Sequence, residues 1–186
     1  MKQGLKKFQG DTQGKRATQG QKVGEKFVKD ILEILKINII EPKQYSAIIN
    51  TIKTSMKPDF IVKPSHTSIE IFGNIDYIFL ESKFKQIAGS DWEKIESNFG
   101  FHNFFYNQLC NINIQTIVIL SGFWKKLQKN YYHFMYYFKR IYGENIIFDF
   151  GDSVDEIYRF AEFMDISLTN EQKNNIINIW NKNFKI

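Results

Sequence analysis

Two carboxylates and an amine stand at strand-like positions in KPDFIVKPSHTSIEIFGNIDYIFLESKFKQ, residues 57–86. Asp59 follows a proline and opens a short β-branched run, whereas Glu81 and Lys83 end a longer apolar run. Because side chains alternate between the two faces of a strand, Glu81 and Lys83 share one face and Ser82 points to the other. A neighbouring strand that begins at Asp59 would bring a second carboxylate beside them.

Two carboxylates beside an amine are typical of a site for a hard divalent cation. Mg²⁺, with Mn²⁺ as a substitute, takes oxygen ligands, commonly one or two carboxylates completed by water and substrate phosphate. Such a cation polarises a phosphoryl oxygen and lowers the pKa of a bound water. We therefore expect Asp59 and Glu81 as metal ligands, with the backbone carbonyl of Ser82 directed sideways near the metal and the Lys83 ammonium orienting the water.

A third acid, Glu25, precedes this stretch on an expected helix. In GEKFVKDILEILK, residues 24–36, Val28, Leu32 and Leu35 line one helical face, and Glu25 continues the same line. Two interpretations remain open. Glu25 completes the outer part of the metal site, or it is a first-turn glutamate that interacts favourably with the helix dipole.

The expected elements alternate between helices and strands, which predicts an α/β domain with a central mixed β-sheet flanked by helices. Strands are expected at 59–62, 67–73, 75–84, 115–122 and 145–150, the first three as a small meander. Further helices are expected at 89–109, 123–143, 153–164 and 169–182, and 45–55 is read as a strand or a short helix. Ser90 with Glu93 predicts a capping box, and Thr169 is the expected cap of the last helix. The expected core stripe of 123–143 consists of Leu127, Tyr131, Phe134, Phe138 and Ile141.

The positive charge is concentrated at the start of the chain. Residues 1–29 carry eight Lys/Arg and two Asp/Glu, whereas the other 157 residues carry 17 and 18. We interpret residues 1–22, rich in Gly, Gln and Lys, as a flexible basic arm that either binds a polyanion or is a passive, solubilising tail. The domain is then expected to occupy 23–186, with a core at about 23–122 and a helical C-terminal part at 123–186.

Composition narrows the class of protein further. No apolar run approaches the ~18 residues that a membrane-spanning helix needs, so a cytoplasmic protein without a membrane partner is expected. The single cysteine, Cys110, excludes an intrachain disulfide. His66, His102 and His133 lack the spacing of zinc ligands and are expected to be ordinary surface or core residues.

The motifs together resemble the PD-(D/E)XK nuclease superfamily, which includes many restriction endonucleases. The matching residues are Pro58-Asp59 and Glu81-Ser82-Lys83, preceded by a helix with Glu25, and the element order matches over roughly 23–122. The resemblance implies a restriction-endonuclease-like core in which Asp59 and Glu81 hold Mg²⁺, Lys83 is the catalytic lysine and Glu25 an accessory acid. The segment from Lys63 to Asn74 is longer than a minimal hairpin, and its Glu70 is a competing acid.

The function implied is a Mg²⁺-dependent endodeoxyribonuclease that cuts double-stranded DNA, in the first place a homodimeric type II restriction enzyme. Homing or repair nucleases and junction resolvases are alternatives within the same fold. An alternative of another class is a non-catalytic nucleic-acid-binding protein whose acids are structural.

Contacts to DNA are expected from basic and polar side chains outside the acid cluster. The arm supplies several of them, and Gln86 follows the motif as a polar residue often does in restriction enzymes. The helix at 123–143 interleaves basic residues with tyrosines on the side opposite its core stripe, which suits a nucleic-acid backbone as well as a solvated surface. The residues expected to bind DNA are Lys6, Lys7, Lys15, Arg16, Lys22, Gln86, Lys125, Lys129 and Lys139.

Overall fold

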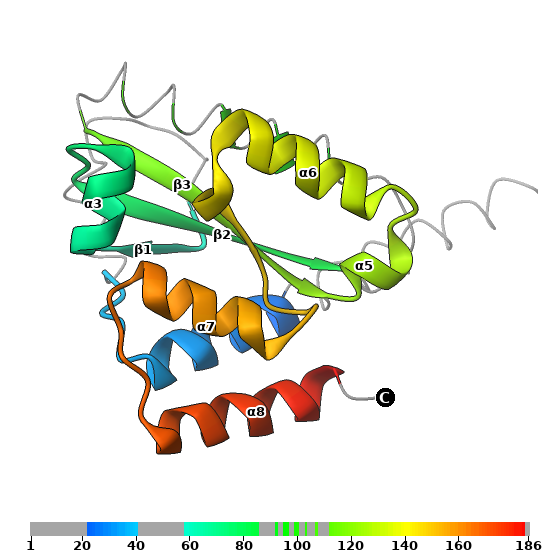
Figure 1. The fold of residues 1–186 in the computed structure, drawn as a ribbon. Coiled ribbons are helices and arrows are strands. Elements are labelled where there is room, and N and C mark those ends of the chain that lie inside the picture. The colour runs from blue at the N-terminus through cyan, green and yellow to red at the C-terminus, as the bar shows by residue number, and fades with distance from the viewer. Residues whose placement is uncertain are drawn as a thin grey trace, which may run out of the picture.

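A mixed sheet with the strand order β1–β2–β3–β4 lies at the centre of the fold (Figure 1). β1 (Phe60–Val62) pairs antiparallel with β2 (Tyr77–Lys85), while β3 (Ile114–Gly122) and β4 (Ile147–Asp149) continue the sheet in parallel. The computed structural model describes residues 22–40, 58–85 and 112–184 and, between them, Trp92, Ile95, Glu96, Phe99, Gly100, Asn103 and Asn107.

Helices cover both faces of this sheet. Residues 22–34 form the first described helix, and the later ones are α3 (His66–Phe72), α5 (Trp124–Leu127), α6 (Tyr131–Tyr142), α7 (Val154–Phe163) and α8 (Asn170–Phe184). A 3-10 turn, Glu144–Ile146, leads from α6 into β4. The helix at 22–34, α7 and α8 lie on one side of the sheet and α6 on the other (Figure 1). The prediction of an α/β fold with a mixed sheet flanked by helices is confirmed.

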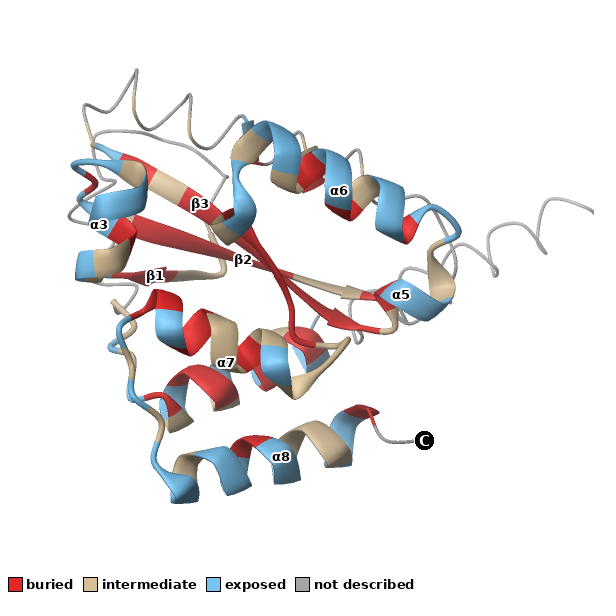
Figure 2. Ribbon diagram, in the orientation of Figure 1, coloured by how far each residue is buried: buried red, intermediate tan, exposed pale blue. Residues whose placement is uncertain are grey.

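The two faces of the sheet contribute residues to two different apolar cores. On the α7 face, Ile78 and Leu80 of β2 join Ile117 and Ile119 of β3 in a core with the helix at 22–34, α7 and α8. On the α6 face, Val118 and Leu120 of β3 pack with residues of α6 and with Trp124. β3 is buried on both faces, which explains why its sequence is one continuous apolar run (Figure 2).

The strand expected at 67–73 is wrong, because this segment forms helix α3. Its alternation of polar and apolar residues fits a strand, yet Ser65 caps a helix by accepting a hydrogen bond from the Ser68 backbone. The start of α3 is also fixed from outside: Ser65 donates to the carbonyl of Phe163, and Thr67 hydrogen-bonds Asp165. The expected meander is therefore a direct β1–β2 pair with a helix in its connection.

The single helix expected at 123–143 is also wrong, because the chain is interrupted between α5 and α6. Since α6 begins anew at Tyr131, its buried side follows Tyr131, Met135 and Phe138. Ile141, expected in the core, is exposed.

Other expectations are confirmed. The strands at 59–62, 75–84, 115–122 and 145–150 and the last two helices appear with boundaries shifted by a few residues. Thr169 accepts a hydrogen bond from the Gln172 backbone at 3.2 Å, as its role as a cap requires. The segment at 45–55 and the Ser90–Glu93 capping box lie outside the described residues.

Both proposed parts of the domain contribute to one core. Residues of the helix at 22–34 pack in the same cluster as α7 and α8, and β4 completes the sheet from beyond residue 123. Among the described helices, none combines the length and the apolar character needed to cross a membrane.

Candidate active site

The pairing of β1 with β2 brings the two predicted acids together. Phe60 pairs with Leu80 in this antiparallel ladder, so one further step of the register places Asp59 opposite Glu81. A carboxylate oxygen of Asp59 accepts a hydrogen bond of 2.7 Å from the backbone nitrogen of Ser82. The sequence separation of 21 intervening residues is thus bridged by one strand pair.

Ser82 directs its backbone toward this same edge. The Lys85 carbonyl points to β3, where the Phe123 nitrogen donates to it at 2.8 Å. Since backbone groups of successive residues point to opposite neighbours, the N–H and C=O of Ser82 point toward β1. Continuing the register places Pro58 opposite Ser82. Proline has no N–H to donate, so the Ser82 carbonyl meets no ladder donor from Pro58.

Glu81 and Lys83 form an ion pair on the α6 face of β2. The Lys83 Nζ lies 2.8 Å from Glu81 Oε2, and only 4% of Glu81 is exposed. Their neighbours on β3 are Val118 and Leu120, so the pair rests beside an apolar surface. The Lys83 side chain is 25% exposed and is therefore the member of the pair that reaches solvent.

The pKa of Asp59 is raised from 3.8 to about 7. Burial of the carboxylate is the main cause, and the negative charge of Glu81 adds to it. The charge of Lys83 and the hydrogen bond from Ser82 act in the opposite direction, and Glu25 raises the pKa further. The charges of Glu25, Glu81 and Lys83, which were predicted to share its site, therefore all act on Asp59.

Glu25 reaches this place because its helix begins close to the end of β2. Gly24 abuts Phe84 so tightly that a Cβ at position 24 would overlap the Phe84 side chain. Val28, Leu32 and Leu35 are buried on the α7 face, as predicted from their spacing. Because it has no side chain, Gly24 lets the first turn of the helix pack directly against Phe84 of β2.

The donor atoms fit a hard cation in kind. Asp59 and Glu81 supply two carboxylates whose negative charges repel each other, and the Ser82 carbonyl lies at the same strand edge. Within the described residues, no group of three or more His, Cys, Asp or Glu side chains could hold a metal ion. A cation here would therefore have two carboxylates and a backbone oxygen, with water and substrate completing its shell, as is common for Mg²⁺.

Two further residues bear on this site and were not predicted. Trp124 of α5 donates from its indole nitrogen to the Lys83 carbonyl at 2.9 Å. The Lys85 ammonium, which is buried, lies 4.8 Å from the centre of the same indole. Lys85 lies on the same face of β2 as Glu81 and Lys83, so the alternation of side chains along the strand could have identified it. No local pattern in the sequence indicates that the distant Trp124 reaches this place.

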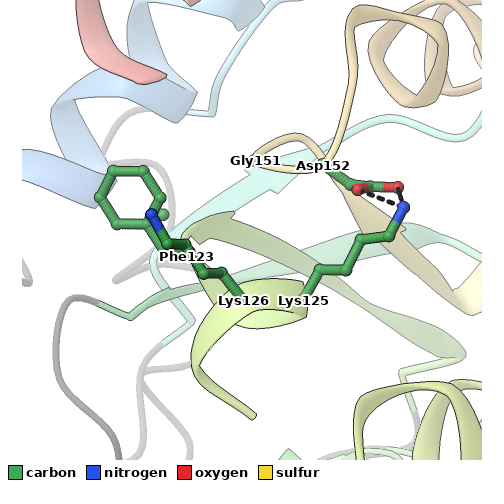
Figure 3. A pocket seen from close by; sticks show the side chains of 6 residues that line it. Phe123, Lys125, Lys126, Gly151 and Asp152 are labelled. Atoms are coloured by element: carbon green, nitrogen blue, oxygen red, sulfur yellow. Dashed lines mark hydrogen bonds and ion pairs between the residues drawn. The ribbon is translucent and has the colours of Figure 1, made fainter. Parts of the chain in front are cut away.

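A pocket of about 220 Å³ opens at the ends of β3 and β4 (Figure 3). Phe123, Lys125 and Lys126 line one side of it and Asp152 another, with an ion pair of 2.9 Å between Lys125 and Asp152. A Cβ on Gly122, one of the residues that line the pocket, would overlap the Lys85 backbone, and Gly122 has a φ of +89°. β2 and β3 are therefore in close backbone contact at the Lys85–Gly122 pair.

A second buried carboxylate, Asp149, ends β4. It accepts hydrogen bonds from the Tyr131 hydroxyl at 2.8 Å and from the backbone nitrogens of Gly151 and Asp152 at 3.0 and 3.2 Å. Burial raises its pKa to about 7. Because these donors hold a turn in place, Asp149 has a structural setting, unlike Asp59.

The competing acid Glu70 lies apart from the acid pair. It is on the exposed side of α3 and pairs with His66 at 3.3 Å. α3 connects the end of β1 to the start of β2, whereas Glu81 and Lys83 lie toward the other end of β2. Glu70 is also not among the charges that shift the pKa of Asp59.

The residues predicted to bind DNA fall into three groups. Lys22 is exposed at the start of the first described helix. Lys125, Lys129 and Lys139 lie on or between α5 and α6, where Lys139 pairs with Glu144 at 3.4 Å. The residues outside the described part of the chain are Lys6, Lys7, Lys15, Arg16 and Gln86.

Comparison with protein-family models, with curated proteins and with solved structures finds no match to this chain. The residues and their geometry are therefore the basis for assigning a function.

Proposed function

We propose that this protein is a Mg²⁺-dependent endodeoxyribonuclease with a restriction-endonuclease-like core. The observation that carries the proposal is the juxtaposition of Asp59 and Glu81 at one strand edge, with Lys83 paired to Glu81 at 2.8 Å. Two like charges held together under burial are costly unless a cation shares them. The electrostatic cost of placing Asp59 beside Glu81 therefore supports a role in cation binding rather than a role in stabilising the fold.

Each residue has a role that follows from its position. Asp59 and Glu81 would hold the cation, with the Ser82 carbonyl as a backbone ligand at the same edge. When bound, Mg²⁺ supplies charge neutralisation at the phosphate and lowers the pKa of its water. The Lys83 ammonium reaches solvent and carries the positive charge needed beside an attacking water and a phosphate. Glu25 would act from outside the first ligand set.

Trp124 and Lys85 support the orientation of Lys83. The indole hydrogen bond fixes the Lys83 carbonyl, and the indole ring is held in turn by the buried Lys85 ammonium at 4.8 Å. A catalytic group is effective only when its own backbone and rotamer are fixed by such neighbours. Through Trp124, α5 therefore links the end of β3 to β2 at Lys83.

Within this class, we propose double-stranded DNA as substrate and a type II restriction enzyme as the first choice. One such site cuts one strand, so a homodimer of this small chain would cut both. Homing or repair nucleases and junction resolvases share the same chemistry. They differ in substrate shape, which cleavage of linear, nicked and branched DNA would distinguish.

Cleavage of supercoiled plasmid DNA tests the proposal. We expect nicked and linear products with Mg²⁺ or Mn²⁺ and none in EDTA, and we expect Glu81→Gln to be inactive while it stays folded. Glu70→Ala is the matched control, because it removes an exposed acid from the same β1–β2 unit. Activity that persists in EDTA, or in folded Glu81→Gln, would contradict the metal-site assignment. A purified protein that binds DNA but never cuts it would favour the non-catalytic alternative.

A further inference from the structure

The outer side of α5 and α6 carries a row of tyrosine and cationic side chains. We call the set formed by Lys125, Lys129, Tyr132, Tyr136 and Arg140 the tyrosine–cation surface. Tyr132 is 65% exposed and Tyr136 71%, which is unusual for such large rings. Tyr132, Tyr136 and Arg140 follow one another at intervals of four and therefore lie along one side of α6.

The charge of this region is one-sided. Residues 123–143 contain five Lys/Arg, no Asp or Glu, and five of the nine tyrosines of the chain. In the described part of the chain, Lys129 and Arg140 form no ion pair and the Tyr136 hydroxyl no hydrogen bond. Nearby acids are engaged at the border: Glu144 pairs with Lys139, and Glu96 accepts from Tyr137 at 3.1 Å.

A second copy of the chain is a poor occupant for this surface. In a two-fold dimer the same patch faces itself, so lysines and arginine would meet lysines and arginine. A polyanion meets the cations favourably. Among polyanions, a nucleic acid also offers flat bases to the exposed rings, and base–aromatic stacking requires bases that are not paired inside a duplex.

We propose that the tyrosine–cation surface binds single-stranded nucleic acid, with phosphates at Lys129 and Arg140 and bases against Tyr132 and Tyr136. The surface lies on the same side of the sheet as Glu81 and Lys83, and α5 is joined to Lys83 by the Trp124 hydrogen bond. A strand bound there would run close to the candidate active site. Binding requires no cleavage, so this inference stands or falls separately from the nuclease assignment.

Lys125 gives the surface a defined start. Its ammonium lies 5.6 Å from the Tyr132 ring centre and 2.9 Å from Asp152, at the mouth of the pocket between β3 and β4 (Figure 3). This pairing holds Lys125 at one end of the row, while Lys129 and Arg140 remain available to phosphates. We therefore expect the phosphate contribution to come mainly from Lys129 and Arg140.

Fluorescence anisotropy with a labelled oligothymidylate, in EDTA so that no cleavage occurs, tests the proposal. Each lost stacking contact weakens binding by roughly tenfold or more. The double variant Tyr132→Ala/Tyr136→Ala should therefore bind the oligonucleotide on the order of 100-fold more weakly, with little change for a blunt duplex of the same length. The double variant Lys129→Gln/Arg140→Gln should flatten the slope of log affinity against log salt by about 1.4, at ~0.7 per phosphate contact on a single strand.

Matched controls keep the interpretation specific. Tyr137→Ala removes a tyrosine of α6 that already has a partner, and Lys173→Gln/Lys182→Gln removes two charges from α8 across the sheet. Both should bind like the parent. The proposal is overturned if the Tyr132/Tyr136 double variant binds single strands as the parent does. Equal losses for duplex and single strand, binding only to anionic lipid vesicles, or conversion of a dimer to a monomer by that variant would also overturn it.

Discussion

Asp59 and Asp149 are two carboxylates whose pKa values are raised alike and whose surroundings differ. The pKa of each is raised to about 7, mainly by burial. Asp149 is surrounded by donors, since the Tyr131 hydroxyl and two backbone nitrogens point at it. Asp59 receives the Ser82 backbone hydrogen bond and faces a second acid, Glu81. A raised pKa therefore does not identify a catalytic group; the identity of its neighbours does.

The same contrast appears in where the two residues lie. Asp149 ends β4, where it is only 1% exposed and closes the turn to Asp152. Asp59 is half-buried at the start of β1, where Pro58 interrupts the ladder and Lys83 reaches solvent. Asp59 is therefore more open to solvent than Asp149. Asp149 should therefore matter for folding and Asp59 for chemistry, and the following changes test that division.

The largest effect is expected from Lys83→Met, which keeps the aliphatic stem and removes the charge. If Lys83 stabilises the transition state, single-turnover cleavage should fall on the order of 100- to 1,000-fold. Lys173→Met on the exposed side of α8 is the matched control and should cleave like the parent. A folded Lys83→Met protein with full activity would remove Lys83 from the mechanism.

Asp149→Ala should act on stability. The change leaves the Tyr131 hydroxyl and two backbone N–H groups without their acceptor, and an unsatisfied buried group costs about 1–3 kcal/mol. We expect the free energy of unfolding to fall by roughly 2–4 kcal/mol in urea denaturation. Protein that remains folded should still cleave DNA, and a loss of cleavage without a loss of stability would break the division.

The stability of the metal-free protein should decrease as the pH rises from about 4 to about 7. In this window the folded state holds protons on Asp59 and Asp149 that the unfolded state has already released, since both pKa values lie above 3.8. The decrease is expected to be several kcal/mol, because each carboxyl contributes about 1.4 kcal/mol for every pH unit between its unfolded and folded pKa. Asp165, whose pKa is lowered by Thr67, acts only below this range.

Denaturation at several pH values in EDTA measures this dependence. Asp59→Asn and Asp149→Asn should each flatten it, because each removes one of the two titrating carboxyls. Stability that increases over the same interval would show that neither carboxyl is protonated in the folded protein.

The smallest effect is expected from Glu25→Gln. Glu25 is the weakest of the influences on the pKa of Asp59, and outer groups of a metal site typically change activity by 10- to 100-fold. We expect a decrease of roughly tenfold in cleavage, with a higher Mg²⁺ concentration needed for half-maximal rate. A decrease as large as that of Lys83→Met would place Glu25 among the direct ligands, and no change would leave it as a first-turn residue of its helix.

The alternation of side chains along β2 was enough to predict that Glu81 and Lys83 share a face. A strand beginning at Asp59 was expected to bring a second carboxylate beside them, and the β1–β2 pairing places Asp59 opposite Glu81. Helix α3 was missed because its polar–apolar alternation has the period of a strand, and contacts to Phe163 and Asp165, about 98 positions away, decide its structure.

Long-range contacts also explain the other omissions. Trp124 and Lys85 meet across the end of the sheet, and no local pattern predicts that the indole also contacts the Lys83 carbonyl. Asp149 stands in the apolar run IIFDF, residues 146–150. The sequence does not show which donor satisfies this carboxylate, because Tyr131 donates to it from a different element. The sequence pattern of 123–143 also did not show the break between α5 and α6, and Ile141, which was expected in the core, is exposed.

The most direct test compares Asp59→Asn with Asp149→Asn in one cleavage assay. Both substitutions remove a carboxyl of similar pKa and keep its shape, so they compare the surroundings of the two groups. With both proteins verified as folded by circular dichroism, we predict that Asp149→Asn cleaves DNA with Mg²⁺ at close to the parent's rate and that Asp59→Asn cleaves at least 100-fold more slowly, on the order expected for loss of a transition-state interaction. Equal rates for the two variants, or a folded Asp59→Asn protein as active as the parent, would contradict the account.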